Sequence, residues 1–332
     1  MASSIQTAQA ETVNVQGDVT ESSPQSNLPD AVQPLRVNWI YSVTIGAIHV
    51  FSLLALIPYF FSWVGVVVML VGIHVFGQGV TIGYHRLLTH RSFRTPKWVE
   101  HLFAILGICC FEDSPVRWVV VHRIHHVHSD EKPDPHSPIV NFLWSHFGWL
   151  MVRNRTTQSI GATDKFAKDL LRDPFYMRLE KRPYIQLGIA LSQIPIFFLA
   201  GFIGGWFYGG LPSAIQYGSS ILVWGVFVRV VAVWHITWSV NSLSHMFGYQ
   251  NYDTGERSRN NWFVALITVG EGWHNNHHED PSAASVQHRW WEIDISYYEI
   301  KLLEKLGLAS DVIVPRHLRR TNRPAEETRQ AG

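Results

Sequence analysis

Two long stretches of the chain contain no charged side chain, and their apolar residues are nearly continuous. The first runs from Val37 to His85 and is 49 residues long, and the second runs from Pro183 to Val228. A helix needs about 20 apolar residues to cross the hydrocarbon core of a bilayer, so each stretch can hold two crossings. Soluble cores rarely contain such runs. The pattern therefore predicts an integral, multi-pass membrane protein.

Turn residues divide each stretch into two parts. Pro58 and the aromatic residues up to Trp63 mark a turn in the first stretch, and Gly209, Gly210 and Pro212 mark one in the second. We therefore predict four transmembrane helices in two hairpins, over about residues 38–59, 62–84, 184–208 and 217–241. The remaining segments also have mostly helical patterns. The expected fold is all-α, with a mostly helical cap outside the membrane.

The basic residues predict which side of the membrane carries the cap. Of the 27 Lys and Arg, 15 lie between Arg86 and Arg182 and 10 follow Val240, whereas neither hairpin turn has any. The positive-inside rule then places both segments and both termini in the cytosol. Residues 1–35 contain four acids and no base, which predicts a disordered tail. Residues 312–332 predict a basic flexible tail, so the membrane domain spans 36–311.

Composition narrows the chemistry. The formal net charge is +1, which disfavours a nucleic-acid partner. The two cysteines, Cys109 and Cys110, are adjacent, so neither a disulfide framework nor a cysteine-rich zinc module is expected. The 18 histidines stand out against 26 acids, and they need an explanation.

The histidines form clusters at ligand-like spacing, each on the predicted cytosolic side. These are His85 and His90; His122, His125 and His126; Asn241 and His245; and His274, His277 and His278. On an α-helix, where each residue turns about 100°, each triplet covers an arc of about 100° and can face one point. His85 and His90 would be about 140° apart, so they either serve two metals or lie where the helix unwinds.

Nine imidazoles without a thiolate describe an all-nitrogen metal site. Imidazole suits zinc, copper, iron and nickel, and a tetrahedral zinc needs only four ligands. Nine histidines and a polar asparagine therefore favour two metal ions with open or water-filled positions. A single cluster could be a chance surface group, but three on one membrane face argue against chance.

These boxes, next to a four-crossing core, resemble the membrane fatty-acyl desaturases, above all the acyl-CoA (stearoyl-type, Δ9) branch and its bacterial relatives. The similar segments are His85-Arg-Leu, His122-Arg-Ile-His-His126, Asp134-Pro-His136, Ser145-His-Phe-Gly-Trp149, Asn241-Ser-Leu-Ser-His245 and Gly270-Glu-Gly-Trp-His-Asn-Asn-His-His278. The resemblance implies a di-iron centre with these nine histidines as ligands and Asn241 bound through water. It also implies that O₂ and two electrons introduce a cis double bond into a saturated acyl chain.

The resemblance leaves several points open. Trp118 and Trp238 occupy positions where the family has tryptophans, and they either shape a substrate tunnel or belong to core packing. Val120 and Val121 stand where the animal acyl-CoA enzymes have Arg-Asp, so the chain can be carried by CoA, a carrier protein or a lipid. Electrons are expected from a separate ferredoxin, cytochrome b5-like protein or flavin reductase. Basic residues of the C-terminal tail could dock an acidic donor or anionic lipid, or simply be solvated: Arg316, Arg319, Arg320 and Arg323.

Other functions compete with desaturation. The nearest is a membrane di-iron hydroxylase or monooxygenase on a lipid or alkyl substrate, because histidine boxes do not separate the two outcomes. A bis-histidine heme protein would use His49 and His74 but leaves the clustered triplets unexplained. A zinc transporter is a third alternative, which metal analysis would distinguish.

Overall fold

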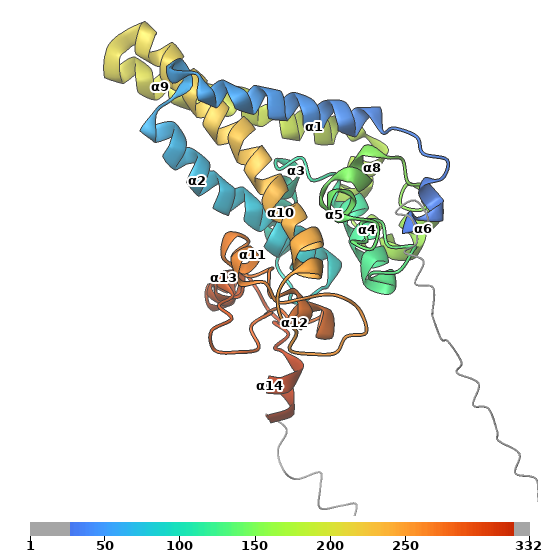
Figure 1. Cartoon of the computed structure of the whole chain (residues 1–332). Coiled ribbons are helices and arrows are strands. Elements are labelled where there is room, and N and C mark those ends of the chain that lie inside the picture. The colour runs from blue at the N-terminus through green and yellow to red at the C-terminus, as the bar shows by residue number, and fades with distance from the viewer. Residues whose placement is uncertain (1–26, 322–332) are drawn as a thin grey trace, which may run out of the picture.

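The computed structural model describes residues 27–321, and its long apolar helices dominate the shape (Figure 1). Three helical stretches are long and apolar enough to cross a membrane: 39–56, 63–89 and 183–246. The first consists of α1 (Trp39–Ser52) and η3 (Leu53–Leu56), and the second of α2 (Trp63–Gln78) and η5 (Gly79–Thr89). The turn η4 (Pro58–Phe60) joins them, inside the turn that the sequence predicts.

The third stretch is 64 residues long and folds back on itself. It comprises α9 (Pro183–Leu222), η7 (Val223–Val228) and α10 (Arg229–Met246). Gly209 and Gly210 leave the helical conformation, and Gly210 has a φ of 69°, which side chains disfavour. A Cβ on Gly205 would lie 2.4 Å from the Ser213 carbonyl oxygen, so the two arms pack closely. The chain thus reverses at the predicted glycine turn.

A buried cation braces the middle of this helix bundle. Arg229 is fully buried and donates to the carbonyl oxygens of Gly225 at 3.0 Å and Cys109 at 3.2 Å. It also bonds Gln193, and its guanidinium lies 4.2 Å from the centre of the Phe76 ring. A charge inside a membrane protein should face protein partners, and Arg229 does.

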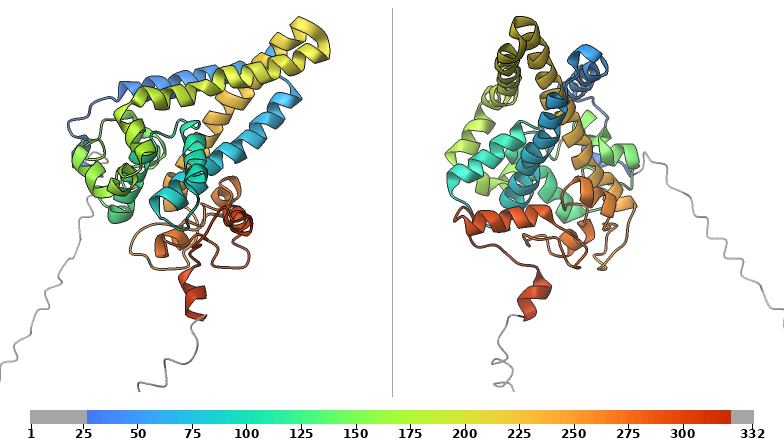
Figure 2. Two further views of the ribbon diagram at one scale, coloured as in Figure 1. Left: turned by 180° about the vertical axis from the view of Figure 1, so that it is seen from behind. Right: turned by 90° about the vertical axis from the view of Figure 1, so that its left-hand side faces the viewer.

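The remaining elements form a cap at one end of the long helices (Figure 2), and no strand occurs among the described residues. They are η2 (Asp30–Val32), α3 (Lys97–Ile108), α4 (Pro115–His128), α5 (Phe142–His146), η6 (Gly148–Met151), α6 (Ile160–Phe166), α7 (Lys168–Leu171), α8 (Pro174–Lys181), α11 (Trp262–Ile267), α12 (His274–Glu279), α13 (Ile295–Lys305) and α14 (Arg316–Thr321). The all-helical class is therefore confirmed. The described chain begins and ends on the cap side.

Most of the predicted N-terminal tail lies outside the described residues, as do residues 322–332 and hence Arg323. The described part of the tail, 27–35, includes Leu28 and Val32, which are buried against Val140 and Trp144. This segment therefore packs on the cap.

Candidate metal centre

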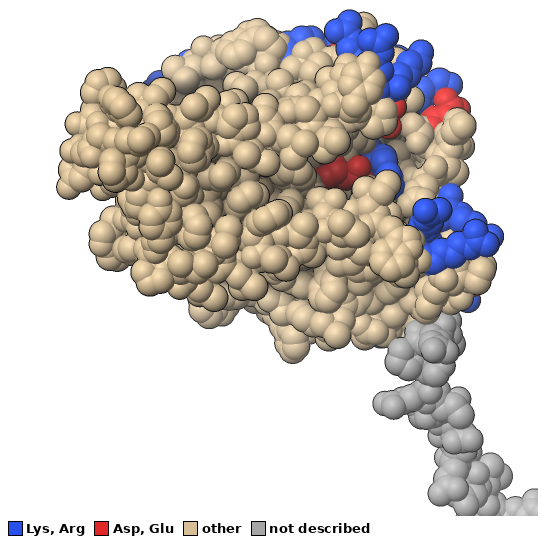
Figure 3. Space-filling model, turned by 90° about the horizontal axis from the view of Figure 1, so that it is seen from above, with Lys and Arg blue, Asp and Glu red and all other residues tan. Residues whose placement is uncertain are grey.

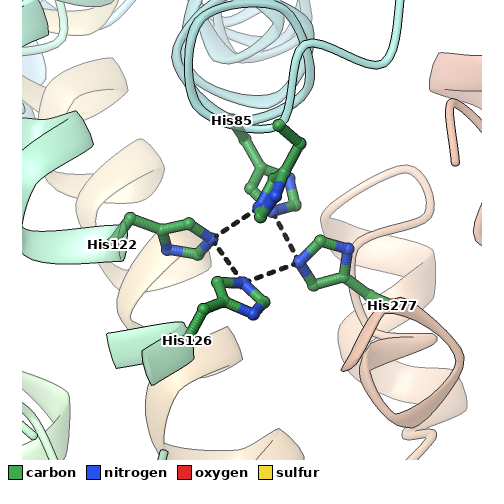
Figure 4. Close-up of side chains that lie close together, drawn as sticks. His85, His122, His126 and His277 are labelled. Carbon is green, nitrogen blue, oxygen red and sulfur yellow. Dashed lines mark hydrogen bonds between the residues drawn. The ribbon is translucent and has the colours of Figure 1, made fainter. Parts of the chain in front are cut away.

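The structure gathers all nine predicted histidines into two neighbouring clusters inside the cap. We call them the five-histidine and four-histidine clusters. The first contains His85, His90, His122, His126 and His277, and the second contains His125, His245, His274 and His278. In each cluster one ring nitrogen of every member lies within 4.8 Å of the others. Figure 4 shows four members of the five-histidine cluster pointing their rings at a common centre.

A π-helix brings His85 and His90 together. The segment η5 has the wide π turn, in which residue i bonds residue i+5, and the His90 N–H donates to the His85 carbonyl oxygen at 3.1 Å. The two imidazoles therefore lie on one face, with ring centres 4.8 Å apart. On a regular helix they would diverge, so this unwinding resolves the alternative that the sequence left open.

Two short helices each serve both clusters. On α4, His122 and His126 belong to the five-histidine cluster, whereas His125 belongs to the four-histidine cluster. On α12, His277 belongs to the first cluster, and His274 and His278 belong to the second. The clusters are therefore adjacent because neighbouring positions on the same helix face different centres.

The Nε2 atoms face one another at short range. In the five-histidine cluster, His277 Nε2 lies 3.1 Å from that of His85 and 3.0 Å from that of His126. In the four-histidine cluster, His274 Nε2 lies 3.0 Å from that of His245 and 3.0 Å from that of His278. The rings thus present the same nitrogen to a shared point.

Carboxylates hold the opposite nitrogens. His85 Nδ1 lies 2.7 Å from a Glu271 oxygen, and His125 Nδ1 lies 2.9 Å from one of Asp134. A carboxylate only accepts, so each Nδ1 carries the proton and each Nε2 carries a lone pair. Metal-ligating histidines are typically held by outer carboxylates in this way. His245 repeats the arrangement, with Asp130 at 3.1 Å from its Nδ1.

These lone pairs need a cation. Two Nε2 lone pairs cannot hydrogen-bond to each other, and the buried Nε2 of His125 has no hydrogen-bond partner among the described residues. Burial, followed by the neighbouring imidazoles, holds the pKa of His122, His126 and His277 well below its ordinary value, so they stay neutral near pH 7. The donor set therefore fits metal ions bound by imidazole nitrogen.

Glu271 and Arg86 link the centre to the rest of the cap. Arg86 is buried and donates to Glu271 at 2.7 Å, to Asp294 at 2.9 Å and to the Ala284 carbonyl oxygen at 2.8 Å. Burial alone would raise the pKa of Glu271, but Arg86 and His85 lower it to about 2. Glu271 therefore stays ionised while it orients His85.

Two cavities meet beside the clusters. The inner cavity, of about 820 Å³, is lined mainly by aliphatic residues of α2 and α10, together with His85 and His274. The outer cavity, of about 1480 Å³, is lined by residues of α1, α9 and the cap, including His122. Both volumes include space open to the surroundings. Small-molecule sites usually measure about 300–1,000 Å³, so the pair suits a long ligand.

The predicted tunnel residues and Asn241 lie at these cavities. Trp118 and Asn241 line both, as does Thr237, whereas Trp238 lines the outer one alone. Trp118 also stacks on His122, with ring centres 4.9 Å apart. Asn241 is one helical turn before His245 on α10.

Sequence reasoning missed the groups that orient the histidines. Asp130, Glu256, Glu271 and Asp294 come from separate segments, and only the fold brings them to His85, His245 and Arg86. One signal was present, because Asp134 and Glu271 lie inside segments that carry the resemblance. A buried carboxylate next to a histidine box is a typical outer partner of a ligand.

The family follows from a match over most of the chain. Residues 60–303 match the family model described as fatty acid desaturase. The chain is a membrane fatty acid desaturase. It is an integral membrane oxidoreductase with long apolar helices, and its substrate is a fatty acyl chain.

Relatives of this desaturase differ in carrier and position. It is 43% identical over 279 residues to the sn-1 stearoyl-lipid 9-desaturase of Anabaena variabilis, covering 83% of this chain and 94% of that protein. It is 39% identical to an acyl-CoA 5-desaturase of Anemone leveillei, covering 88% and 87%. It is also 39% identical to the chloroplastic palmitoyl-monogalactosyldiacylglycerol delta-7 desaturase of Arabidopsis thaliana, covering 81% and 67%. Family membership alone therefore leaves the double-bond position open.

Proposed function

We propose that this desaturase introduces a cis double bond at Δ9 of a saturated acyl chain, at two iron ions held by the two histidine clusters. The observation that carries the proposal is the convergence of nine imidazoles beside two cavities that share lining residues. The Δ9 position is supported by the similarity to the stearoyl-lipid 9-desaturases of Anabaena variabilis and Synechocystis.

Each cluster would hold one metal. His85, His90, His122, His126 and His277 are the ligands proposed for the first ion, and His125, His245, His274 and His278 for the second, which Asn241 completes through a water. Five imidazoles exceed the four ligands of a tetrahedral zinc, and zinc has no redox chemistry. The irons, when bound, supply the oxidation by O₂ and two electrons that removes two hydrogens from adjacent CH₂ groups.

The chain's own residues orient the substrate and exclude water. The inner cavity has aliphatic walls from Leu70, Ile73, Val80 and Val233, which suit the methyl half of an acyl chain. The outer cavity has more polar groups in its lining and suits the carboxyl half. Trp118 is common to both cavities, so we propose that it fixes the chain at the bend beside the clusters. Trp238 forms the neighbouring wall of the outer cavity.

We further propose that the protein crosses the membrane four times, with the cap and both termini in the cytosol. The reversal at Gly209 and Gly210 supports two crossings in the 64-residue stretch, and the concentration of Lys and Arg in the cap supports its side. Electrons come from a separate donor of the ferredoxin, cytochrome b5-like or flavin reductase class. Arg316 and Arg319 are less suited to bind it, because both pair with Asp280.

Fatty-acid profiling tests the function. The full chain is expressed under air in a host without desaturases, with iron supplied, and the double bonds are located by mass spectrometry of derivatised esters. We expect Δ9 monoenes. A Δ5 or Δ7 product would overturn the position, hydroxy acids would identify a monooxygenase, and an unchanged profile with an iron-loaded protein would overturn the activity.

A further inference from the structure

We propose that the acyl chain reaches the metal centre sideways from the bilayer, through the gap between α1 and the first arm of α9, while it is still esterified in a glycerolipid. This inference rests on the proposed function and names the carrier of its substrate. It is carried by the walls, the surface and the unpartnered polar groups of the outer cavity.

The walls of the gap come from residues near the ends of two membrane helices. α1 contributes Ile40 and Tyr41, and α9 contributes Gln186 and Leu187. Ile40 is 75% exposed and Leu187 is 54% exposed, although both line the cavity. At about 1.5 Å per residue, Leu187 lies only about 6 Å along α9, the depth of a lipid's glycerol region rather than of its chain ends.

The surface around the opening suits lipid. Figure 3 looks onto the face formed by α1 and α9: most of it is uncharged, and a hollow near one end shows acidic and basic side chains at its floor. The other charges visible on this face, most of them Lys and Arg, gather at the same end. Glu112, Asp113 and Arg117 are the charged residues that line the outer cavity. The hollow lies where this charged end meets the uncharged part of the face, which suits contact with acyl chains, so a lipid can enter without leaving its leaflet.

One buried donor at the cavity lacks an acceptor. Trp149 Nε1 has no hydrogen-bond partner among the described residues, and Trp149 lines the outer cavity. A saturated hydrocarbon accepts no hydrogen bond, whereas the carbonyl oxygens of a glycerol ester do. Asn38, Gln158 and Gln186 add uncharged amide groups to the lining, and none of these side chains has a hydrogen-bond partner within residues 27–321. The cavity is thus prepared for the ester end of a lipid.

The charge of the lining disfavours CoA. Asp113 lies 3.4 Å from the Nε of Arg117, the one Lys or Arg of the lining, and also accepts a hydrogen bond from Tyr41. Burial raises the pKa of Glu112 to about 8, so this acid adds little charge near pH 7. A nucleotide carrier with several phosphates would meet no net positive charge there. A glycerol ester needs no positively charged lining to bind it, so the lining favours the lipid.

Reconstituted protein tests the carrier. The iron-loaded full chain is placed in nanodiscs of dioleoylphosphatidylcholine that contain deuterated distearoyl phosphatidylglycerol or distearoyl galactosyldiacylglycerol, and stearoyl-CoA is added to a third sample. Reduced ferredoxin and air are supplied to all. We expect a double bond in the intact labelled lipid, at a rate about tenfold or more above that with stearoyl-CoA.

Blocking the gap tests the path. Leu187→Trp should lower the rate on the lipid by about tenfold or more, with bound iron unchanged. The control is Leu191→Trp, one turn along α9, because Leu191 is 43% exposed but lines neither cavity, and it should stay within about twofold of the parent. If Leu187→Trp fails to insert, Ile40→Trp on the opposite wall replaces it.

The outcomes separate this inference from the function beneath it. Conversion of stearoyl-CoA while lipid-bound stearate stays saturated would overturn the glycerolipid carrier and leave the desaturase intact. Equal rates in the two α9 variants would overturn the side opening. Conversion of neither substrate by iron-loaded protein would overturn the proposed activity itself.

Discussion

Glu271→Gln is the sharpest test of how the metal centre is held. One Glu271 oxygen accepts from His85 Nδ1 at 2.7 Å, and the other accepts from Arg86 at 2.9 and 2.7 Å. An amide keeps the size of the carboxylate but has only one accepting atom, so one of the two partners then faces an NH₂ group. The substitution therefore removes either the orientation of His85 or the main partner of Arg86.

The expected loss can be scaled from both contacts. Removing an outer partner of a metal ligand costs about 10–100-fold in affinity, which corresponds to about 1.4–2.8 kcal/mol. Breaking a buried ion pair costs about 3–5 kcal/mol of stability, and the lower end applies because Arg86 retains Asp294 and the Ala284 carbonyl oxygen. We therefore expect weaker iron binding together with a lower melting temperature of the iron-free protein.

The assay measures bound iron per chain against a competing chelator, in detergent, alongside thermal unfolding of the metal-free protein. Glu299→Gln is a matched control, because Glu299 holds His74 at the same 2.7 Å but lies outside both clusters. Iron affinity within about twofold of the parent in Glu271→Gln would refute the assigned role of the carboxylate. An equal loss of iron affinity in Glu299→Gln would show that removing any buried or half-buried carboxylate weakens iron binding, whether or not it contacts the clusters.

Three further predictions follow from the site. His125→Ala and His277→Ala should each abolish turnover and reduce bound iron while membrane insertion persists, because each removes a ligand from a different cluster, and turnover retained by either variant would exclude that residue. Gly77→Phe should shift the product towards shorter acyl chains, because Gly77 lines the inner cavity with open space around it and a phenyl ring there would shorten that cavity. Gly46→Phe is the control: Gly46 also has open space around it but lines neither cavity, so the chain length should not change. Acidification should release iron and destabilise the protein. Burial, then neighbouring imidazoles, lower the pKa of His274 and His278, so the unfolded chain binds protons before the folded one as the pH falls below about 6.5. Dialysis at a series of pH values, with iron content measured after each, should show loss of iron on the acid side only.

The sequence predicted which histidines gather because helical spacing is a local property. His274, His277 and His278 fall on one arc of any α-helix, so their convergence needs no knowledge of the fold. The charge-free runs likewise reveal the long apolar helices, since a bilayer imposes length on every crossing. The glycine turn was visible because a reversal needs backbone conformations that other residues avoid, and Gly210 adopts one of them.

The sequence could not reveal what depends on distant contacts. Whether His85 and His90 share a centre depends on the π turn of η5, which helical periodicity does not show. The histidines of α4 are divided between two clusters because of where α12 and α10 pack against it. Glu271 lies far along the chain from His85, so only tertiary structure pairs them. The packing of residues 27–35 on the cap was missed because they follow a long polar segment and carry only two anchoring side chains, Leu28 and Val32.

The interleaving of the two histidine clusters on α4 and α12 has a mechanical consequence. His125 and His126 are bonded neighbours on one backbone, yet they serve different clusters, and His277 and His278 do the same. The distance between the two centres is therefore fixed by covalent geometry within single helical turns. Bending of the long membrane helices as lipids come and go would shift the pair as a unit and leave its internal spacing intact.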